Sequence, residues 1–227
     1  MKRVFHKTIL NKESRRSFLK KFSAAVAAVF VSSCKDDDPK DTIINLKAAI
    51  TAETNVNAIY TAYAAKAQDE GYRKISNMFR SAAYAEKIHA GNHNDVLKKL
   101  GEPEFKPTAE TPTVKSTVEN LLTAIASETR EYQEMYPSFI ATAQKEKCGA
   151  AVDSFTWASF AEQNHAGEFS EALRILEEFE SEATLPAKWF ICKQCGGMFK
   201  GGFTKCGICR TDADRQHYIP EVFDSSM

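Results

Sequence analysis

The sequence has no long hydrophobic run. Its N-terminal apolar stretch, residues 22–31, is too short to cross a bilayer as a permanent helix. Runs of β-branched residues are few, whereas alanine, glutamate and lysine are plentiful, so the composition favours helices over strands. No stretch resembles a nucleotide-binding site, which argues against direct use of a nicotinamide donor.

An excess of positive charge occurs only at the N-terminus. The 227-residue chain has a formal net charge of zero, but residues 1–33 hold eight Lys and Arg residues against one acid. The remainder therefore has a net charge of −7. A chain this acidic has no general electrostatic attraction to nucleic acid or to anionic lipid headgroups, so we expect no nucleic-acid partner.

Residues 1–33 have the features of an export signal. A basic segment containing Arg15-Arg16 precedes the apolar residues, and small residues precede Cys34. The paired arginines resemble a twin-arginine signal, and the last four residues resemble a lipobox. These features predict a periplasmic or cell-envelope lipoprotein, attached to a membrane only through a lipid on Cys34, with residues 34–41 as a lipidated tether. The alternative is a buried first helix, which the positive charge disfavours.

Residues 42–182 are predicted to be all-α. Apolar residues recur at helical spacing over residues 42–68, 72–100, 113–147 and 150–180, with a bend expected at Pro137. The proline-containing residues between the second and third helices form a long connection instead of a tight turn. This order predicts a ferritin-like four-helix bundle with one long crossover.

The two predicted helix pairs are related by an internal repeat. Glu86 and His89 match Glu162 and His165, together with the Ala-Gly that follows each histidine. In the other two helices Glu53 matches Glu128, and Tyr60 matches Tyr136 after one inserted residue. The repeat predicts two similar helical hairpins that face each other, with the glutamates near mid-bundle.

Each helix pair contains a Glu-x-x-His motif, whose spacing puts both side chains on one helix face. One such motif is common by chance, and exposed carboxylates usually pair with lysines. Here the flanking residues are apolar, and five uncompensated carboxylates would repel one another. The pattern indicates a dinuclear site for iron or manganese. Its predicted ligands are Glu53, Glu86, His89, Glu128, Glu131, Glu162 and His165.

Residues 187–223 contain two Cys-x-x-Cys pairs, which predict a tetrahedral sulfur site for iron or zinc. Disulfides are the alternative in an oxidising compartment, but adjacent pairs with glycine turns fit a metal better. The metal would also hold together a segment too short and glycine-rich to fold on a core. Cys148 is expected to be a helix-end residue without a role. The predicted ligands of this four-cysteine site are Cys192, Cys195, Cys206 and Cys209.

The chain resembles rubrerythrin over about residues 42–223. The resemblance rests on Glu128 and Glu131 followed by Glu134-Met135-Tyr136-Pro137, and on Trp189 before the first cysteine pair. Two positions depart from the usual rubredoxin-like pattern, in which an aromatic residue stands in place of Gly197 and a proline in place of Gly207. The resemblance implies a ferritin-like bundle followed by a rubredoxin-like domain, in which iron is the expected metal of the four-cysteine site.

The resemblance also implies two non-haem irons and their ligands. Glu86 and Glu162 would bridge the irons. Glu53 would be a terminal ligand to one iron, and Glu128 with His165 would be terminal ligands to the other.

The implied activity is the reduction of hydrogen peroxide to water in oxidative-stress defence. Glu131 and His89 would exchange as ligands to one iron as its redox state changes, and Tyr60 and Tyr136 would hydrogen-bond the ligands. The iron of the four-cysteine site would relay electrons to the di-iron site of a partner subunit in a homodimer or higher homo-oligomer. An exported or membrane redox carrier would supply the electrons.

Two other functions compete with this one. The first is ferritin-like iron oxidation and storage, which requires assembly into a shell that the appended module and the tether would obstruct. The second is a non-enzymatic module in which zinc occupies the four-cysteine site and the bundle is a binding scaffold.

Overall fold

Helices dominate the part of the chain that the structure describes. The structure is a computed structural model, and it describes residues 39–212, 214 and 216–219. All of these belong to one unit of the chain, Ser32–Met227. The predicted signal, Cys34 and most of the tether lie outside the described residues, as does the end of the predicted cysteine module. Within the described ranges, no helix is long and apolar enough to span a membrane.

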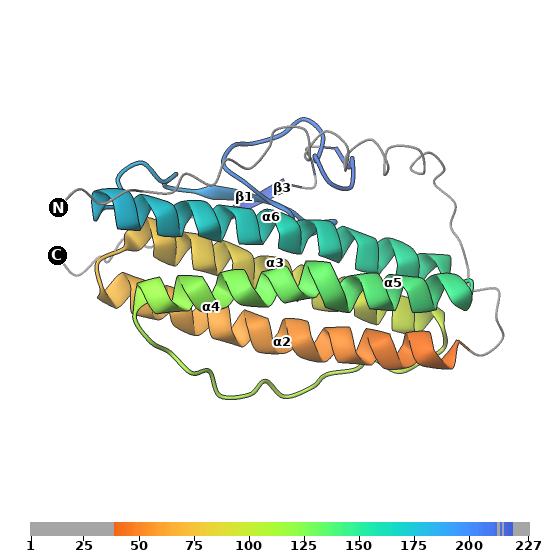
Figure 1. Cartoon of the computed structure of the whole chain (residues 1–227). Coiled ribbons are helices and arrows are strands. Elements are labelled where there is room, and N and C mark those ends of the chain that lie inside the picture. Colours follow the sequence, from red (N-terminus) through yellow and green to blue (C-terminus); the bar gives the residue numbers. More distant parts are fainter. Residues whose placement is uncertain (1–38, 213, 215, 220–227) are drawn as a thin grey trace, which may run out of the picture. The chain divides into compact units, whose positions relative to one another are not determined.

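The helices lie side by side in a four-helix bundle (Figure 1). Residues 100–116 leave the second helix and run along the outside of the bundle to the start of the third (Figure 1). The predicted bundle with one long crossover is therefore confirmed. Its elements are α2 (Lys40–Asp69), α3 (Arg73–Lys99), α4 (Thr117–Arg130), the π-helical segment η1 (Glu131–Met135), α5 (Tyr136–Lys145) and α6 (Gly149–Phe179).

Two helix starts differ from the prediction. The first helix begins at Lys40, so the end of the predicted tether is helical. The third helix begins at Thr117 instead of residue 113, because Ser116 and Glu119 form a capping box. The Ser116 hydroxyl accepts from the Glu119 N–H, and the Glu119 carboxylate accepts from the Ser116 N–H. This pairing satisfies backbone groups that the first helical turn leaves without partners.

The third helix contains one turn of π-helix, η1, at the predicted metal site. The Tyr136 N–H donates to the Glu131 carbonyl, five residues back in the chain. Relative to the first hairpin, one residue is inserted between Glu128 and Tyr136. A wider turn absorbs such an insertion without ending the helix. The irregularity therefore begins at Glu131, before Pro137, where the sequence predicts a bend.

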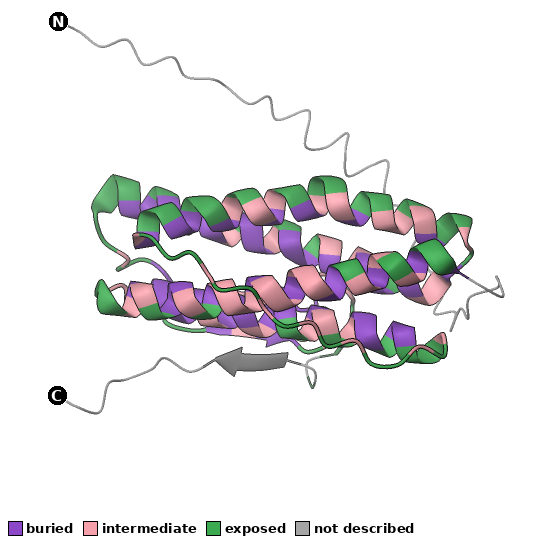
Figure 2. Cartoon of the chain, turned by 90° about the horizontal axis from the view of Figure 1, so that it is seen from below, coloured by how far each residue is buried: buried purple, intermediate pink, exposed green. Residues whose placement is uncertain are grey.

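The apolar core is divided into two clusters with the predicted ligands between them. On α2, Glu53 lies between Ile50 of one cluster and Val56 of the other. On α6, the Glu162 motif lies between Ala158 and Phe169 in the same way. Figure 2 shows the buried faces of the helices turned towards the interior. The bundle thus has a polar layer at mid-length, closed on both sides by packed apolar side chains.

Glutamates from distant segments stabilise the starts of three helices. Glu146 accepts from the Thr42 N–H at the start of α2, at 2.8 Å. Glu182 accepts from backbone N–H groups at the start of α3, and Glu70 accepts from one at the start of α4. A carboxylate at a helix N-terminus satisfies free N–H groups and complements the helix dipole.

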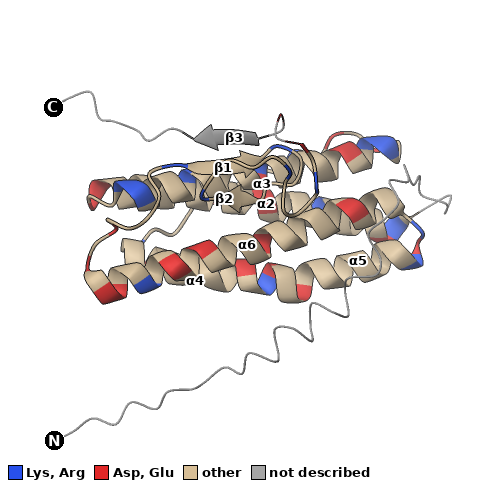
Figure 3. Cartoon of the chain, turned by 90° about the horizontal axis from the view of Figure 1, so that it is seen from above, with Lys and Arg blue, Asp and Glu red and all other residues tan. Residues whose placement is uncertain are grey.

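A small antiparallel sheet follows the bundle. Its strands are β1 (Trp189–Cys192), β2 (Met198–Phe199) and β3 (Gln216–Ile219), in the order β2-β1-β3. Strands β1 and β2 lie over α3 and α6 near the middle of the bundle (Figure 3). Asn164 on α6 accepts from the Met198 N–H, and Asn92 on α3 donates to the Gln194 carbonyl, both at 2.8 Å. The sheet and its loops therefore cover the level of the bundle that holds the predicted ligands.

The core packing gives the first prediction. Phe155→Ala should lower the free energy of unfolding by about 3–5 kcal/mol, because the Phe155 ring is fully buried and its removal leaves a cavity. Phe179 on the same helix is 56% exposed, so Phe179→Ala should change it by less than about 0.5 kcal/mol. Urea denaturation followed by circular dichroism measures both. Equal losses in the two variants would contradict this packing.

Candidate metal centres

The seven predicted ligands of the bundle come together in its interior. Each is at most 1% exposed. They lie on all four helices: Glu53 on α2, Glu86 and His89 on α3, Glu128 on α4, Glu131 on η1, and Glu162 and His165 on α6.

Six of the seven ligands surround two points. Around the first, His89 Nδ1 lies 2.8 Å from Glu86 Oε2, 2.9 Å from Glu162 Oε1 and 3.9 Å from Glu53 Oε2. Two ligand atoms bound at right angles to one ion at about 2.1 Å lie ~3 Å apart, so these spacings suit a shared metal ion. The four residues have ligand atoms within 4.8 Å of one another.

The second point is built around His165. Its Nδ1 atom lies 2.9 Å from Glu162 Oε2, 3.4 Å from Glu86 Oε1 and 3.8 Å from Glu128 Oε1. Glu86 and Glu162 therefore turn one carboxylate oxygen towards each histidine. In these positions both carboxylates would bridge two metal ions.

The donor set fits a pair of hard divalent or trivalent ions. Buried carboxylate oxygens of Glu53, Glu86, Glu128, Glu131 and Glu162 have no hydrogen-bond partner, and neither does His165 Nδ1. An unpaired buried charge is costly, whereas a pair of metal ions would satisfy most of these atoms. Carboxylate and imidazole ligands suit iron or manganese.

Three carboxylates of the metal-free site have raised pKa values, whereas His89 and His165 lower the pKa of Glu162 despite its burial. Burial and the Glu162 carboxylate raise the pKa of Glu53 to about 8. Burial also raises the pKa of Glu128 and of Glu131. Burial alone would lower the pKa of His165, but the Glu86 and Glu162 carboxylates raise it to about 10. A metal ion must therefore displace protons from this site.

The cysteine module fixes the orientation of both ligand histidines. His89 Nε2–H donates to the Cys195 carbonyl at 3.0 Å, and His165 Nε2–H donates to the Gly196 carbonyl at 3.2 Å. Each ring then has Nδ1 available as a metal ligand. Gly196 is required here, because its φ is 76° and a Cβ atom would lie 2.1 Å from His89 Nε2.

The two predicted tyrosines each donate to a terminal carboxylate. The Tyr60 hydroxyl donates to Glu128 Oε1 at 2.6 Å, and the Tyr136 hydroxyl donates to Glu53 Oε1. Burial and the nearby carboxylates raise the pKa of both phenols, so both stay protonated and act as donors.

Glu131 lies beside the two centres but belongs to neither group of mutually close ligand atoms. One of its oxygens accepts from the Ser127 hydroxyl at 3.3 Å, and the other has no hydrogen-bond partner. The structure thus places His89 among the ligand groups and Glu131 next to them.

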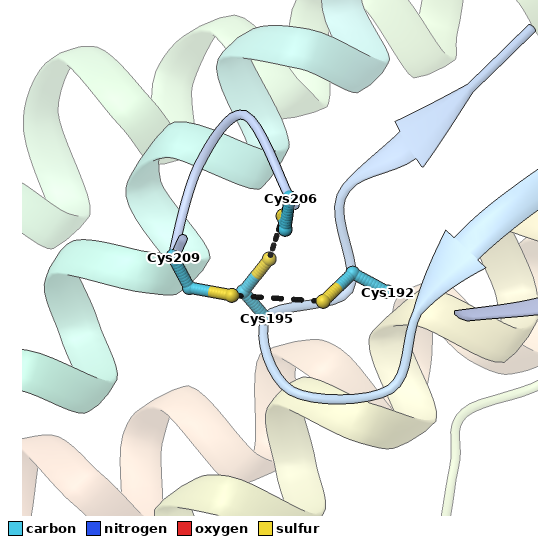
Figure 4. A group of neighbouring side chains, drawn as sticks. All are labelled: Cys192, Cys195, Cys206 and Cys209. Carbon is cyan, nitrogen blue, oxygen red and sulfur yellow. Dashed lines mark hydrogen bonds between the residues drawn. The ribbon is translucent and has the colours of Figure 1, made fainter. Parts of the chain in front are cut away.

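The four predicted cysteine ligands also converge (Figure 4). The Sγ atoms of Cys192 and Cys209 are 3.6 Å apart, and those of Cys195 and Cys206 are 3.5 Å apart. Two thiolates bound to one tetrahedral ion lie ~3.8 Å apart, whereas a disulfide bond is about 2.05 Å long. The geometry fits a metal ion and argues against the disulfide alternative. Cys148, outside this group, is buried at the start of α6.

Sequence reasoning missed several residues at the site. His93 and Ser154 are buried and hydrogen-bonded next to Tyr136, and Asn92 and Asn164 bind the cysteine module. One signal was available for His93, which follows His89 by one helical turn. The contacts of Asn92 and Asn164 are to backbone groups, which leave no such signal in the sequence.

A four-helix bundle with two adjacent metal centres, followed by a four-cysteine site, defines a class of protein: the ferritin-like proteins that bind a dinuclear metal site through carboxylates. The family model for rubrerythrin matches residues 45–173. Nigerythrin of Nitratidesulfovibrio vulgaris is 37% identical over 169 residues, which is 74% of this chain and 81% of nigerythrin. Rubrerythrin of Porphyromonas gingivalis is 30% identical over 153 residues, 67% of this chain and 76% of that protein.

The solved structures agree with this similarity. Fully reduced, all-ferrous nigerythrin matches with a TM-score of 0.71 and 34% identity, over 86% of this chain and 91% of that chain. A bacterioferritin of Mycobacterium tuberculosis matches with a TM-score of 0.57 at 14% identity, which shows the shared ferritin-like fold alone. The chain belongs to the rubrerythrin family. It is accordingly a di-iron oxidoreductase of oxidative-stress defence.

The protonation of the metal-free site gives the second prediction. Manganese(II) binding at about pH 7 should release protons, because Glu53 and His165 have pKa values of about 8 and about 10. Since both values are raised, the affinity should increase as the pH rises towards 8. Calorimetry in two buffers of different ionisation enthalpy measures the protons released, with zinc already in the four-cysteine site. Glu53→Gln should release fewer protons. Identical heats in the two buffers would contradict the prediction.

Proposed function

We propose that this chain reduces hydrogen peroxide to water at the paired centres, with electrons relayed from an iron in the four-cysteine site. One observation carries the proposal. The carbonyls of Cys195 and Gly196 accept hydrogen bonds from the two histidines that face the carboxylate pair. One hydrogen bond would thus connect His89 to Cys195, a member of the thiolate site, and another would connect His165 to Gly196, the next residue along the chain.

Each peroxide needs two electrons and two protons to become two water molecules. The two irons supply both electrons and act as Lewis acids when they are bound. Glu86 and Glu162 would hold both ions, while Glu53 and Glu128 would hold one each. The tyrosine hydroxyls fix the two terminal carboxylates. The apolar clusters on both sides exclude bulk water, which strengthens these interactions.

Glu131 is the residue that suits this function best. It is a buried carboxylate with a free oxygen beside the ligand groups, and it stands on the π-helical turn. When positive charge at the site increases, an anionic ligand is favoured over the neutral His89. We propose that Glu131 then replaces His89, which remains hydrogen-bonded to the Cys195 carbonyl.

The electron relay needs only the contact between module and bundle, which a single chain makes in this structure. A homodimer or higher homo-oligomer is part of the proposal, and exchange of modules between two chains would form the same contact across a dimer. We also propose export through the twin-arginine-type signal and a lipid on Cys34. The electron donor would then be an exported or membrane redox carrier.

The role of Glu131 gives the third prediction. Glu131→Ala should slow oxidation of the reduced protein by one equivalent of peroxide at least tenfold, because the carboxylate that compensates the rising charge is missing. The visible spectrum of the thiolate-bound iron should be unchanged. Anaerobic stopped-flow absorbance measures both. Glu134→Ala is the matched control, since Glu134 lies on the same π-helical turn and is exposed.

Three other observations on the wild-type protein would count against the proposal. Faster oxidation by dioxygen than by peroxide would favour iron oxidation for storage. A colourless protein with one zinc and no iron would favour the non-enzymatic module. Robust peroxide turnover with a nicotinamide donor alone would contradict the proposed class of electron donor.

The contact at Gly196 gives the fourth prediction. Gly196→Ala should slow re-reduction of the oxidised di-iron pair at least tenfold, because a Cβ atom at this position overlaps the His89 ring. The absorbance of the thiolate-bound iron should persist. Gly201→Ala is the control, since its added methyl group meets no atom within 4 Å. Rapid-mixing absorbance with a one-electron donor measures the rate. An unchanged rate in Gly196→Ala would exclude the relay through this contact.

A further inference from the structure

His93 is a fully buried imidazole that the ligand set does not use. It lies on α3, one turn after His89, and its ring packs against Phe155 at a centroid distance of 5.1 Å. Its Nδ1 atom is 2.8 Å from Ser154 Oγ, and its Nε2 atom is 3.2 Å from the Tyr136 hydroxyl. Through Tyr136 it is connected to Glu53, a terminal carboxylate of the first centre.

The hydrogen bonds that connect Ser154 to Glu53 all run in one direction, each donor lying on the Ser154 side of its acceptor. The Tyr136 hydroxyl has one proton and donates it to Glu53, so it must accept from His93 Nε2–H. His93 Nδ1 then accepts from the Ser154 hydroxyl. Burial lowers the pKa of His93 to about 3, so the ring is neutral and has the single N–H that this order requires. Donors aligned in one direction polarise and strengthen one another.

The surroundings of Tyr60, in the other half of the bundle, can be compared with those of Tyr136. Tyr60 donates to Glu128 as Tyr136 donates to Glu53. The sequence offset that relates His89 to His165 makes Phe169 the equivalent of His93, and Met78 the equivalent of Ser154. Both are fully buried, and the Phe169 ring stands edge-on to Tyr60 at 5.3 Å. The flanking phenylalanines, Phe79 and Phe155, are matched in both halves.

The two tyrosines therefore differ in what lies behind the hydroxyl group. Tyr136 has an N–H donor behind it, whereas Tyr60 has an aromatic ring at the equivalent position. A hydroxyl that accepts a hydrogen bond becomes a stronger donor itself. Glu53 consequently accepts a stronger hydrogen bond than Glu128, and it gives less negative charge to its metal. Hydrogen bonds to ligands shift metal reduction potentials in this way.

We propose that His93 is a positioning residue that acts through Tyr136 to make the two irons unequal, so that the iron bound by Glu53 and His89 is reduced first. The inequality would widen the range of potentials over which the one-electron state of the pair is populated. The inference rests on the proposed function only for the presence of two irons, and not for the reaction with peroxide.

The test is a stepwise reductive titration of the iron-loaded full chain, followed by electron paramagnetic resonance of the mixed-valent pair. The amount of mixed-valent signal at half reduction gives the comproportionation constant. His93→Phe copies the opposite half of the bundle and should lower this constant about tenfold, which corresponds to ~1.4 kcal/mol. Ser154→Ala removes only the outer link and should lower it about threefold.

Two further variants separate this role from a purely structural one. His93→Gln keeps an N–H donor towards Tyr136 and should restore most of the wild-type constant. Phe169→Leu changes the equivalent position in the other half and should leave the constant within twofold. An unchanged constant in both His93→Phe and Ser154→Ala would overturn the proposal, as would an equal fall in Phe169→Leu. If His93→Phe fails to load two irons per chain, Ser154→Ala and His93→Gln decide.

The same preparations distinguish this inference from the proposed function. A wild-type protein that does not react with peroxide would refute the proposed function, while the comproportionation constants of the variants would still test the role of His93.

Discussion

The burial of five carboxylates and two imidazoles at one level of the bundle is the constraint on which the rest of the structure depends. Such a layer destabilises a helical bundle unless cations balance its charge. Protons do so partly in the metal-free protein, where the pKa of Glu53 reaches about 8. Two metal ions would do so almost completely, and they would account for the way Glu86 and Glu162 each turn one oxygen towards each histidine. The apolar clusters above and below keep this layer dry.

The cysteine module contributes to this layer through its backbone. Carbonyls of Cys195 and Gly196 fix both ligand histidines, and the asparagines of α3 and α6 hold the module in place. Whatever metal holds the four thiolates together also holds these carbonyls in position. The two sites are therefore connected through the backbone of the cysteine module.

The fold and the groups around both metal sites could be predicted because their signals lie in side-chain identity and spacing. Helical periodicity, an internal repeat and two Cys-x-x-Cys pairs can all be detected in a single sequence. The predicted start of the third helix was wrong because the prediction relied on the spacing of apolar residues and not on the capping box at Ser116. His93 was missed because a histidine on a buried helix face has no partner visible in the sequence. Its partners, Ser154 and Tyr136, lie on other helices.

The π-helical turn has a consequence for the history of the two halves. Glu53 and Glu128 occupy equivalent places, but one additional residue follows Glu128 before the paired tyrosine. Without the wide turn, that residue would rotate all of α5 by about 100° and take its apolar face out of the core. The turn confines the disturbance to five residues, Glu131–Met135. One of two duplicated hairpins could thus absorb an inserted residue, with the packing on both sides left in register.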